Sequence, residues 1–381
     1  MTRRGFLRGS AALAVATHPL GSFAQRTTSH SLFVGTQTGK GSKGIYAYSF
    51  DSATGELSQR GLAAESDNPT FLALSPDRRF LFAANELDEY QGKKSGAVSS
   101  FRVETGSAKL RKINEVSARG PGTCNVSVDH TGHCVFAANY GGGSAASFTV
   151  DRAGKLSEAV SFFQYSGHGP KPQQAGPRGH RVTVSPDNKF LLVNDLGLDE
   201  IHVYHLDAAT AKLTAQNPPV WKALPGSGPR ALVFHPNGRW AYCANEVGSS
   251  VNLLDWDAKK GLLTTAQLIS TVPQGHTGPS APSEIIIDKA GRFVYVANRL
   301  DDFMVSFSVS PTDGKLTLLE RTSCGGKVPR HVALDPTERW LIVADQVTDD
   351  LAVFARDPKT GRLANDGRSF PLSRPQCIVF V

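Results

Sequence analysis

The chain has 381 residues, of which 20% are charged and 40% are hydrophobic, proportions that are ordinary for a soluble globular protein. The formal net charge is +7, but the basic residues are scattered, so a nucleic-acid partner is not indicated. No apolar stretch is long enough to span a bilayer. With 37 glycines and 22 prolines against two methionines, the composition favours many turns over long helices.

The N-terminus has the pattern of a targeting segment. Arg3 and Arg4 precede a mild apolar run over residues 11–16, and Ser22-Phe23-Ala24 is a small-x-small cleavage pattern. Because the Arg-Arg-x-Phe-Leu motif resembles a twin-arginine signal, we expect residues 1–24 to direct export to the periplasm. Loss of this segment would lower the formal net charge to +4. The alternative is a disordered basic tail.

Six segments repeat one pattern, in which two alternating apolar runs flank a Pro-Asp or Pro-Asn-Gly type of turn, as expected for a β-hairpin. Each segment ends in Asn or Asp, at residues 85, 139, 195, 245, 298 and 345. A third strand follows, then a Gly-containing turn and a fourth strand. A period near 50 residues with four strands per unit is typical of a β-propeller blade.

The two chain ends complete the count of blades. Residues 375–381 have the pattern of a first strand, and residues 31–38 that of a second strand without its first. Pairing them makes one more blade and removes an open sheet edge. The sequence therefore predicts an all-β fold, a seven-bladed propeller over residues 31–381, closed by its own termini. We expect it to be a monomer.

Hairpin symmetry predicts a polar mouth. Arg230 and Glu246 are equidistant from Gly238 in their hairpin turn, so the two strands bring them side by side. Innermost strands line the central channel, and the same symmetry in the other blades places further side chains at one mouth. The residues expected there are Glu86, Tyr140, His180, Arg230, Glu246, Glu284, Arg299, Arg330 and His331. A funnel of three Arg and three Glu suggests a binding site, although ion pairs that hold blades together are an alternative.

The recurring Asn residues are expected to cap strand ends, while Asn139 is also a candidate for substrate contact. Together with Glu86, Glu246 and Glu284 it leaves a hard cation open as a ligand, although no metal-binding spacing is present and we expect no cofactor or metal. Four of the five cysteines lie in or beside apolar strands, where buried thiols are expected; one disulfide remains possible.

Several motifs, in this order and at this spacing, resemble the lactonase family, which includes the propeller-type 6-phosphogluconolactonases and fungal 3-carboxymuconate cycloisomerase. They are Asn-Pro-Thr-Phe-Leu-Ala-Leu-Ser-Pro-Asp at 68–77, Ala-Asn-Tyr-Gly-Gly-Gly-Ser at 138–144, Gly-Ser-Gly-Pro-Arg at 226–230, Ala-Asn-Glu at 244–246, Ala-Asn-Arg at 297–299 and Pro-Arg-His at 329–331. The resemblance implies catalytic roles for the residues that match the family's His, two Arg and Glu, which are His180, Arg230, Arg299 and Glu246. From their expected place at the mouth, Glu86, Asn139, Tyr140, Glu284, Arg330 and His331 are predicted to contact the substrate.

Three functions follow as hypotheses. The first is hydrolysis of a sugar-acid lactone, with Glu246 or His180 as general base and the two arginines stabilising the oxyanion. The second is a muconate-type lactonising cycloisomerase. The third is a non-enzymatic exported propeller that binds a sugar acid or a protein. The chain departs from the family by having Arg178 and Ala231 in place of two histidines, and Gln173 where the family has Arg. Together with export, these changes favour an unphosphorylated lactone.

Overall fold

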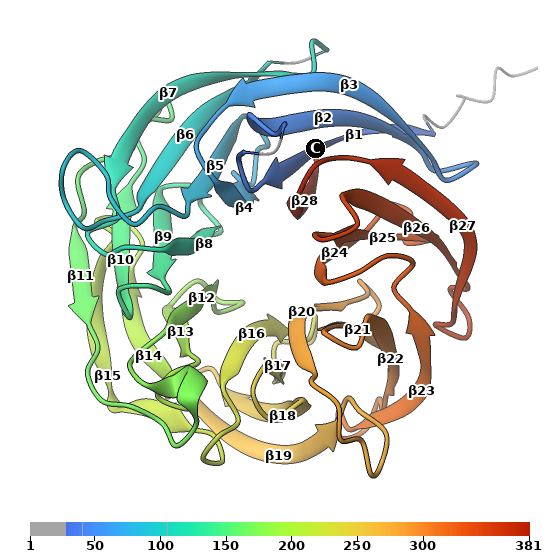
Figure 1. Cartoon of the computed structure of the whole chain (residues 1–381). Helices are drawn as coiled ribbons and strands as arrows, with labels where there is room; N and C mark the ends of the chain where they lie inside the picture. The colour runs from blue at the N-terminus through green and yellow to red at the C-terminus, as the bar shows by residue number, and fades with distance from the viewer. Residues whose placement is uncertain (1–27, 40, 105) are drawn as a thin grey trace, which may run out of the picture.

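The chain forms a ring of seven antiparallel sheets around a central channel, and each sheet has four strands (Figure 1). This computed structural model describes residues 28–39, 41–104 and 106–381, so the expected export signal at 1–24 lies outside the described residues. Within them the one helical element is the 3-10 turn η1 (Pro172–Gln174). No helix among them is long and apolar enough to cross a membrane.

The strands follow one another from the channel outward in every blade. Blade one is β28 (Pro375–Phe380), β1 (Ser29–Thr36), β2 (Gly44–Asp51) and β3 (Glu56–Glu65); blade two is β4 (Pro69–Leu74), β5 (Phe80–Asn85), β6 (Ala97–Glu104) and β7 (Lys109–Ser117). Blade three is β8 (Thr123–Val128), β9 (Cys134–Asn139), β10 (Ser144–Thr149) and β11 (Ser161–Gln164); blade four is β12 (Gly179–Val184), β13 (Phe190–Asp195), β14 (Glu200–Asp207) and β15 (Lys212–Lys222). Blade five is β16 (Pro229–Phe234), β17 (Trp240–Asn245), β18 (Ser250–Asp257) and β19 (Leu262–Ser270); blade six is β20 (Ala281–Ile287), β21 (Phe293–Arg299), β22 (Phe303–Val309) and β23 (Leu316–Ser323). Blade seven is β24 (Pro329–Leu334), β25 (Trp340–Asp345), β26 (Asp350–Arg356) and β27 (Leu363–Pro371).

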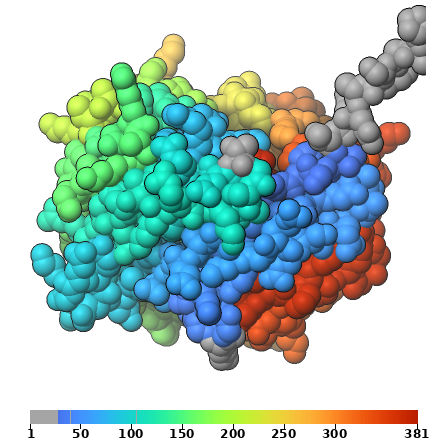
Figure 2. All heavy atoms as spheres, turned by 90° about the horizontal axis from the view of Figure 1, so that it is seen from above, coloured from blue at the N-terminus to red at the C-terminus, as the bar shows by residue number. Residues whose placement is uncertain are grey.

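Blade one closes the ring, as the sequence predicted. The C-terminal strand β28 pairs antiparallel with β1, with Leu32 opposite Phe380 and Val34 opposite Ile378. Figure 2 shows the red C-terminal blade packed directly against the blue N-terminal strands. The two ends of the chain therefore form one continuous four-stranded sheet, and the ring has no open sheet edge at this point.

Hydrophobic clusters lie between neighbouring blades, one at each of the seven interfaces. Between blades two and three, for example, Phe82, Val126 and Phe148 are fully or almost fully buried. Burial of each such side chain contributes about 1.5–3 kcal/mol, so stability is spread around the ring rather than held in one core. All five cysteines are buried and free. Cys324 is therefore buried as well as the four cysteines for which burial was expected, and the described residues contain no disulfide.

A β-bulge near the start of each innermost strand is the local feature that builds the channel wall. In blade five, Pro229 pairs with Asn245 and Ala231 with Ala244, so that Arg230 is skipped by the ladder. The same irregularity skips Thr70, Cys124, His180, Arg330 and Gln376 in their blades, and Ser283 and Glu284 in blade six. Since a bulge bends a strand and re-aims its side chains, the repeat turns one polar position per blade toward the same mouth.

Candidate active site

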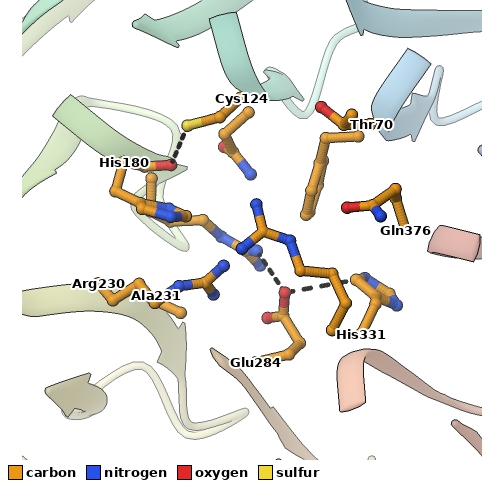
Figure 3. A pocket seen from close by; sticks show the side chains of 12 residues that line it. Thr70, Cys124, His180, Arg230, Ala231, Glu284, His331 and Gln376 are labelled. Carbon is orange, nitrogen blue, oxygen red and sulfur yellow. Dashed lines mark hydrogen bonds and ion pairs between the residues drawn. The ribbon is translucent and has the colours of Figure 1, made fainter. Parts of the chain in front are cut away.

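Two connected chambers occupy the mouth of the channel. The outer chamber encloses about 190 Å³ and is lined by Glu86, Cys124, Tyr140, His180, Glu246, Arg299 and Arg330. The inner chamber is much narrower, about 10 Å³, which is room for about one water molecule. It is lined by Thr70, Phe71, Cys124, Asn125, His180, Arg181, Arg230, Ala231, Glu284, Arg330, His331 and Gln376, and Figure 3 shows these side chains converging from all sides. Cys124, His180 and Arg330 belong to both chambers.

Glu246 joins two arginines from different blades through a single oxygen. Its Oε2 lies 2.8 Å from Nε of Arg230 and 2.5 Å from Nη2 of Arg299. Arg230 also donates from Nη1 to the backbone carbonyl of Ser283 in blade six, and the Ser283 hydroxyl donates to the carbonyl of Pro329 at 2.6 Å. Blades five, six and seven therefore hold both guanidinium groups in fixed positions.

The electrostatics of this bridge keep Glu246 ionised. Burial raises the pKa of the Glu246 carboxyl, but Arg299, Arg230 and Arg330 outweigh that effect, and the pKa is lowered overall. Burial also lowers the pKa of Arg230, and the neighbouring Arg330 and Arg299 lower it further. Because guanidinium groups stay protonated in proteins, the mouth holds a positive field around one carboxylate.

His180 is neutral in this field. The imidazole is buried, and burial lowers its pKa well below the usual range, with further lowering by the charges of Arg230, Arg330 and Arg299. The ring of Tyr140 meets it edge-on at 5.6 Å between centroids. A neutral imidazole has one unprotonated nitrogen, which can accept a proton from water.

Arg181 spans the inner chamber. From blade four its guanidinium pairs with Oε2 of Glu284 in blade six at 3.1 Å and lies 5.0 Å from the ring centre of Phe71 in blade two. Nε2 of His331 lies 3.8 Å from the same Glu284 oxygen, and Figure 3 shows Glu284 between these two partners. This network crosses the channel and narrows it.

Burial and neighbouring charges together set the charge states of the inner network. Burial raises the pKa of Glu284, but nearby positive charge, above all that of Arg181, more than reverses this, so the carboxylate is ionised. Burial lowers the pKa of His331 to about 4, although Glu284 opposes the shift. Nδ1 of His331 accepts the backbone N–H of Ile378 at 3.3 Å, which places the proton of the neutral ring on Nε2, the nitrogen that faces Glu284.

The structure brings together all nine side chains that hairpin symmetry placed at the mouth, each of which lines one or both chambers. Glu86, for instance, accepts the Thr70 hydroxyl at 2.7 Å, as expected from their equal distance to the turn. Asn139, a separate candidate for substrate contact, lines neither chamber and is fully buried inside blade three. Its side chain accepts from Thr123 and donates to the Ala118 carbonyl and to Ser144. Of the two expectations for Asn139, these contacts fit a cap of strand ends and not a substrate contact.

Sequence reasoning missed four residues that line the inner chamber, namely Phe71, Asn125, Arg181 and Gln376. Phe71, Asn125 and Arg181 directly follow the bulged residue, and strict alternation along a strand would have turned them away from the channel. Gln376 could have been predicted from hairpin symmetry. It occupies the same position in blade one as Arg230 does in blade five and Arg330 in blade seven. Among the departures from the family, Ala231 lines the inner chamber, and Arg178 lies 5.1 Å over the ring of Tyr140.

No group of three or more His, Cys, Asp or Glu side chains is close enough to hold a metal ion among the described residues. Within the outer chamber, Glu246 is already occupied by two arginines, and Glu86 accepts a hydroxyl. The arrangement is therefore suited to binding an oxyanion and to moving a proton.

Comparisons with known proteins agree with this fold. The family model described as "Lactonase, 7-bladed beta-propeller" matches residues 31–380. The 6-phosphogluconolactonase of Bacillus subtilis is 33% identical over 294 residues, which cover 77% of this chain and 82% of that protein. A periplasmic gluconolactonase from Pseudomonas aeruginosa superposes with a TM-score of 0.87 at 34% identity, over 93% of this chain and 99% of that one. A putative 6-phosphogluconolactonase from Bacteroides fragilis also superposes with a TM-score of 0.87, at 31% identity, over 94% and 99% of the two chains. The chain therefore belongs to the lactonase family of seven-bladed β-propellers, to which these named lactone hydrolases are similar.

Proposed function

We propose that this chain hydrolyses a sugar-acid lactone where the outer chamber meets the inner one, since Arg299 lines the outer chamber, Arg230 lines the inner chamber and His180 lines both. The observation that carries the proposal is the bridge in which Arg230 and Arg299 share one oxygen of Glu246 beside a neutral His180. When water attacks an ester carbonyl, negative charge develops on the carbonyl oxygen and a proton must leave the water. Two fixed guanidinium groups can stabilise that charge, and a neutral base beside them can accept the proton.

In the proposed mechanism His180 is the general base. Water attacks the lactone carbonyl as the imidazole takes its proton, and Arg230 and Arg299 stabilise the oxyanion. When the ring C–O bond breaks, the protonated imidazole donates that proton to the departing ring oxygen, which becomes a hydroxyl. The resulting acid then ionises in solution. Glu246 positions the arginines rather than acting as base, because its Oε2 is already engaged by both guanidinium groups.

We further propose an unphosphorylated aldonolactone as substrate and the periplasm as location. Two observations support this: the Arg3-Arg4 motif in the sequence, and the 34% identity to a protein described as a periplasmic gluconolactonase. Phosphorylated sugar lactones are cytosolic, so an exported enzyme would meet the unphosphorylated compounds.

A panel of lactones tests the proposal. The mature protein is assayed with glucono-δ-lactone, its 6-phosphate, an aliphatic lactone and a muconolactone against the spontaneous rate. The proposal predicts acid release with glucono-δ-lactone at the highest kcat/KM. Interconversion of a lactone and a muconate without net hydrolysis would identify a cycloisomerase instead. Rates equal to the spontaneous rate on every compound would indicate a binding propeller.

A further inference from the structure

Arg330 carries the unpaired positive charge of the channel. The three other arginines that line the chambers are each ion-paired, Arg181 with Glu284 and both Arg230 and Arg299 with Glu246. The side chain of Arg330 makes neither an ion pair nor a hydrogen bond with any residue in the described part of the chain. A charge that is partly removed from water without a partner costs free energy, and an anion placed beside Arg330 would recover it.

Arg330 lies where the two chambers share their lining. It is the bulged residue of β24 and lines both the outer and the inner chamber. Its charge helps to lower the pKa of His180, of Arg230 and of Glu246. An anion bound to Arg330 would therefore lie within the same electrostatic field as the groups proposed to do the chemistry.

A hydroxyl acceptor shares the outer chamber with this cation. Glu86 accepts the Thr70 hydroxyl but forms no ion pair with any described residue, Arg330 included. An unpaired carboxylate accepts hydroxyl groups, whereas an unpaired guanidinium binds carboxylate or phosphate oxygens. A molecule that carries both an oxyanion and several hydroxyls matches the two groups together.

We propose that Arg330 is the oxyanion anchor of the outer chamber and that it holds the carboxylate or phosphate of a polyhydroxy acid whose hydroxyls donate to Glu86. The sugar nature of the ligand rests on the proposed function, but binding of the oxyanion does not require turnover. Two sources of the oxyanion share this chemistry: the carboxylate formed by hydrolysis, and a phosphate already present on the substrate.

Calorimetric titration of gluconate and of 6-phosphogluconate into the mature protein tests the anchor without catalysis. Arg330→Gln is expected to weaken binding of 6-phosphogluconate by about 10- to 100-fold, the usual effect of losing a hydrogen bond to a charged group, and to weaken gluconate by as much if the anchor holds the carboxylate. Arg330→Lys should lose less, because it keeps the charge but not the planar fork. Arg362→Gln is the matched control, since it removes the same charge from an exposed surface pair with Glu320. Wild-type affinity in Arg330→Gln would overturn the proposal.

The melting temperature of Arg330→Gln distinguishes an anion anchor from an arginine with a purely structural role. Because Arg330 is unpaired beside other cations, Arg330→Gln is expected to raise Tm in the absence of ligand, and gluconate should then raise Tm of the wild type more than that of the variant. A fall in Tm would show that Arg330 is paired in solution and would count against the anchor.

Kinetics separate the two sources of the oxyanion. If the anchor holds the product carboxylate, Arg330→Gln raises the inhibition constant of gluconate and leaves the KM of both lactones unchanged. If it holds a phosphate, the KM rises for the 6-phosphate lactone alone. Both results support the anchor. Anion binding that depends on Arg330 in a protein that hydrolyses no lactone would refute the proposed function and leave the anchor standing.

Discussion

Glu246 and Arg299 come from neighbouring blades and meet at 2.5 Å, with Arg230 on the same carboxylate oxygen. Glu246 follows β17 in blade five and Arg299 ends β21 in blade six, so the pair forms across a blade interface. The bridge therefore couples the assembly of the ring to the shape of the site.

Glu246→Gln removes the charge that holds the two arginines together. We expect kcat/KM to fall by about 100- to 1000-fold, because the guanidinium groups repel each other and leave the position that stabilises the oxyanion. The measurement is steady-state hydrolysis of glucono-δ-lactone. Glu320→Gln makes the same change in an exposed pair with Arg362 and should leave kcat/KM unchanged; a similar loss in both variants would contradict the assigned role.

The pH dependence of kcat/KM should report the neutral state of His180. Burial and three arginines lower its pKa well below the usual value, and the neutral ring is the active form. We expect kcat/KM to stay level as the pH falls from about 8 to below the usual histidine pKa of about 6.5, and to decline only in more acidic solution. A half-maximal point near 6.5 would contradict this, and His180→Asn should lose activity at every pH.

Stability should fall in acid because of His331. Its pKa is about 4 in the folded protein against about 6.5 when unfolded, so the unfolded state binds the extra proton between these values. The contribution of the neutral ring is complete above about pH 6.5, shrinks as the pH falls to about 4, and amounts to about 3 kcal/mol. Urea unfolding of the wild type and of His331→Gln at pH 7 and pH 4.5 measures it: the difference between the two proteins should narrow in acid, and a constant difference would argue against it.

Ser283 is predicted to position Arg230. Its hydroxyl bonds to the carbonyls of Pro329 and Ala297, while its own carbonyl receives Arg230. Ser283→Ala should cost about 1 kcal/mol of stability and also lower kcat several-fold. The matched control is Ser147→Ala, since Ser147 bonds equally deep to the Ala211 carbonyl between blades three and four. It should show the same stability loss with unchanged kcat, and equal kcat in both variants would contradict the prediction.

Turnover is expected to be independent of divalent cations. The proposed mechanism assigns charge stabilisation to Arg230 and Arg299, and Glu246 is engaged by both of them. Assays with and without a chelator should give the same kcat/KM. Loss of activity on chelation, with recovery on adding Ca²⁺, would transfer that role to a metal.

The fold was largely predictable from sequence, because the Asn or Asp that ends each hairpin recurs once per blade and the two termini carry complementary half-blades. The mouth was predictable wherever hairpin symmetry applied, as for Thr70 with Glu86 and Arg230 with Glu246. The bulges were not predictable, since no single residue type marks them, and without them Arg181 should face away from the channel. Asn139 was misplaced because it ends β9 with its side chain bonded inside the blade to Thr123, Ala118 and Ser144, whereas Tyr140, directly after the strand, lines the outer chamber.

A crystal structure of the mature protein with bound gluconate tests the central claim most directly. The account predicts the ligand in the outer chamber, with oxygens within hydrogen-bonding distance of His180 and of Arg230 or Arg299. Gluconate bound elsewhere, for example in the open surface pocket beside Tyr90, Lys93 and Arg119, with the channel residues untouched, would contradict it.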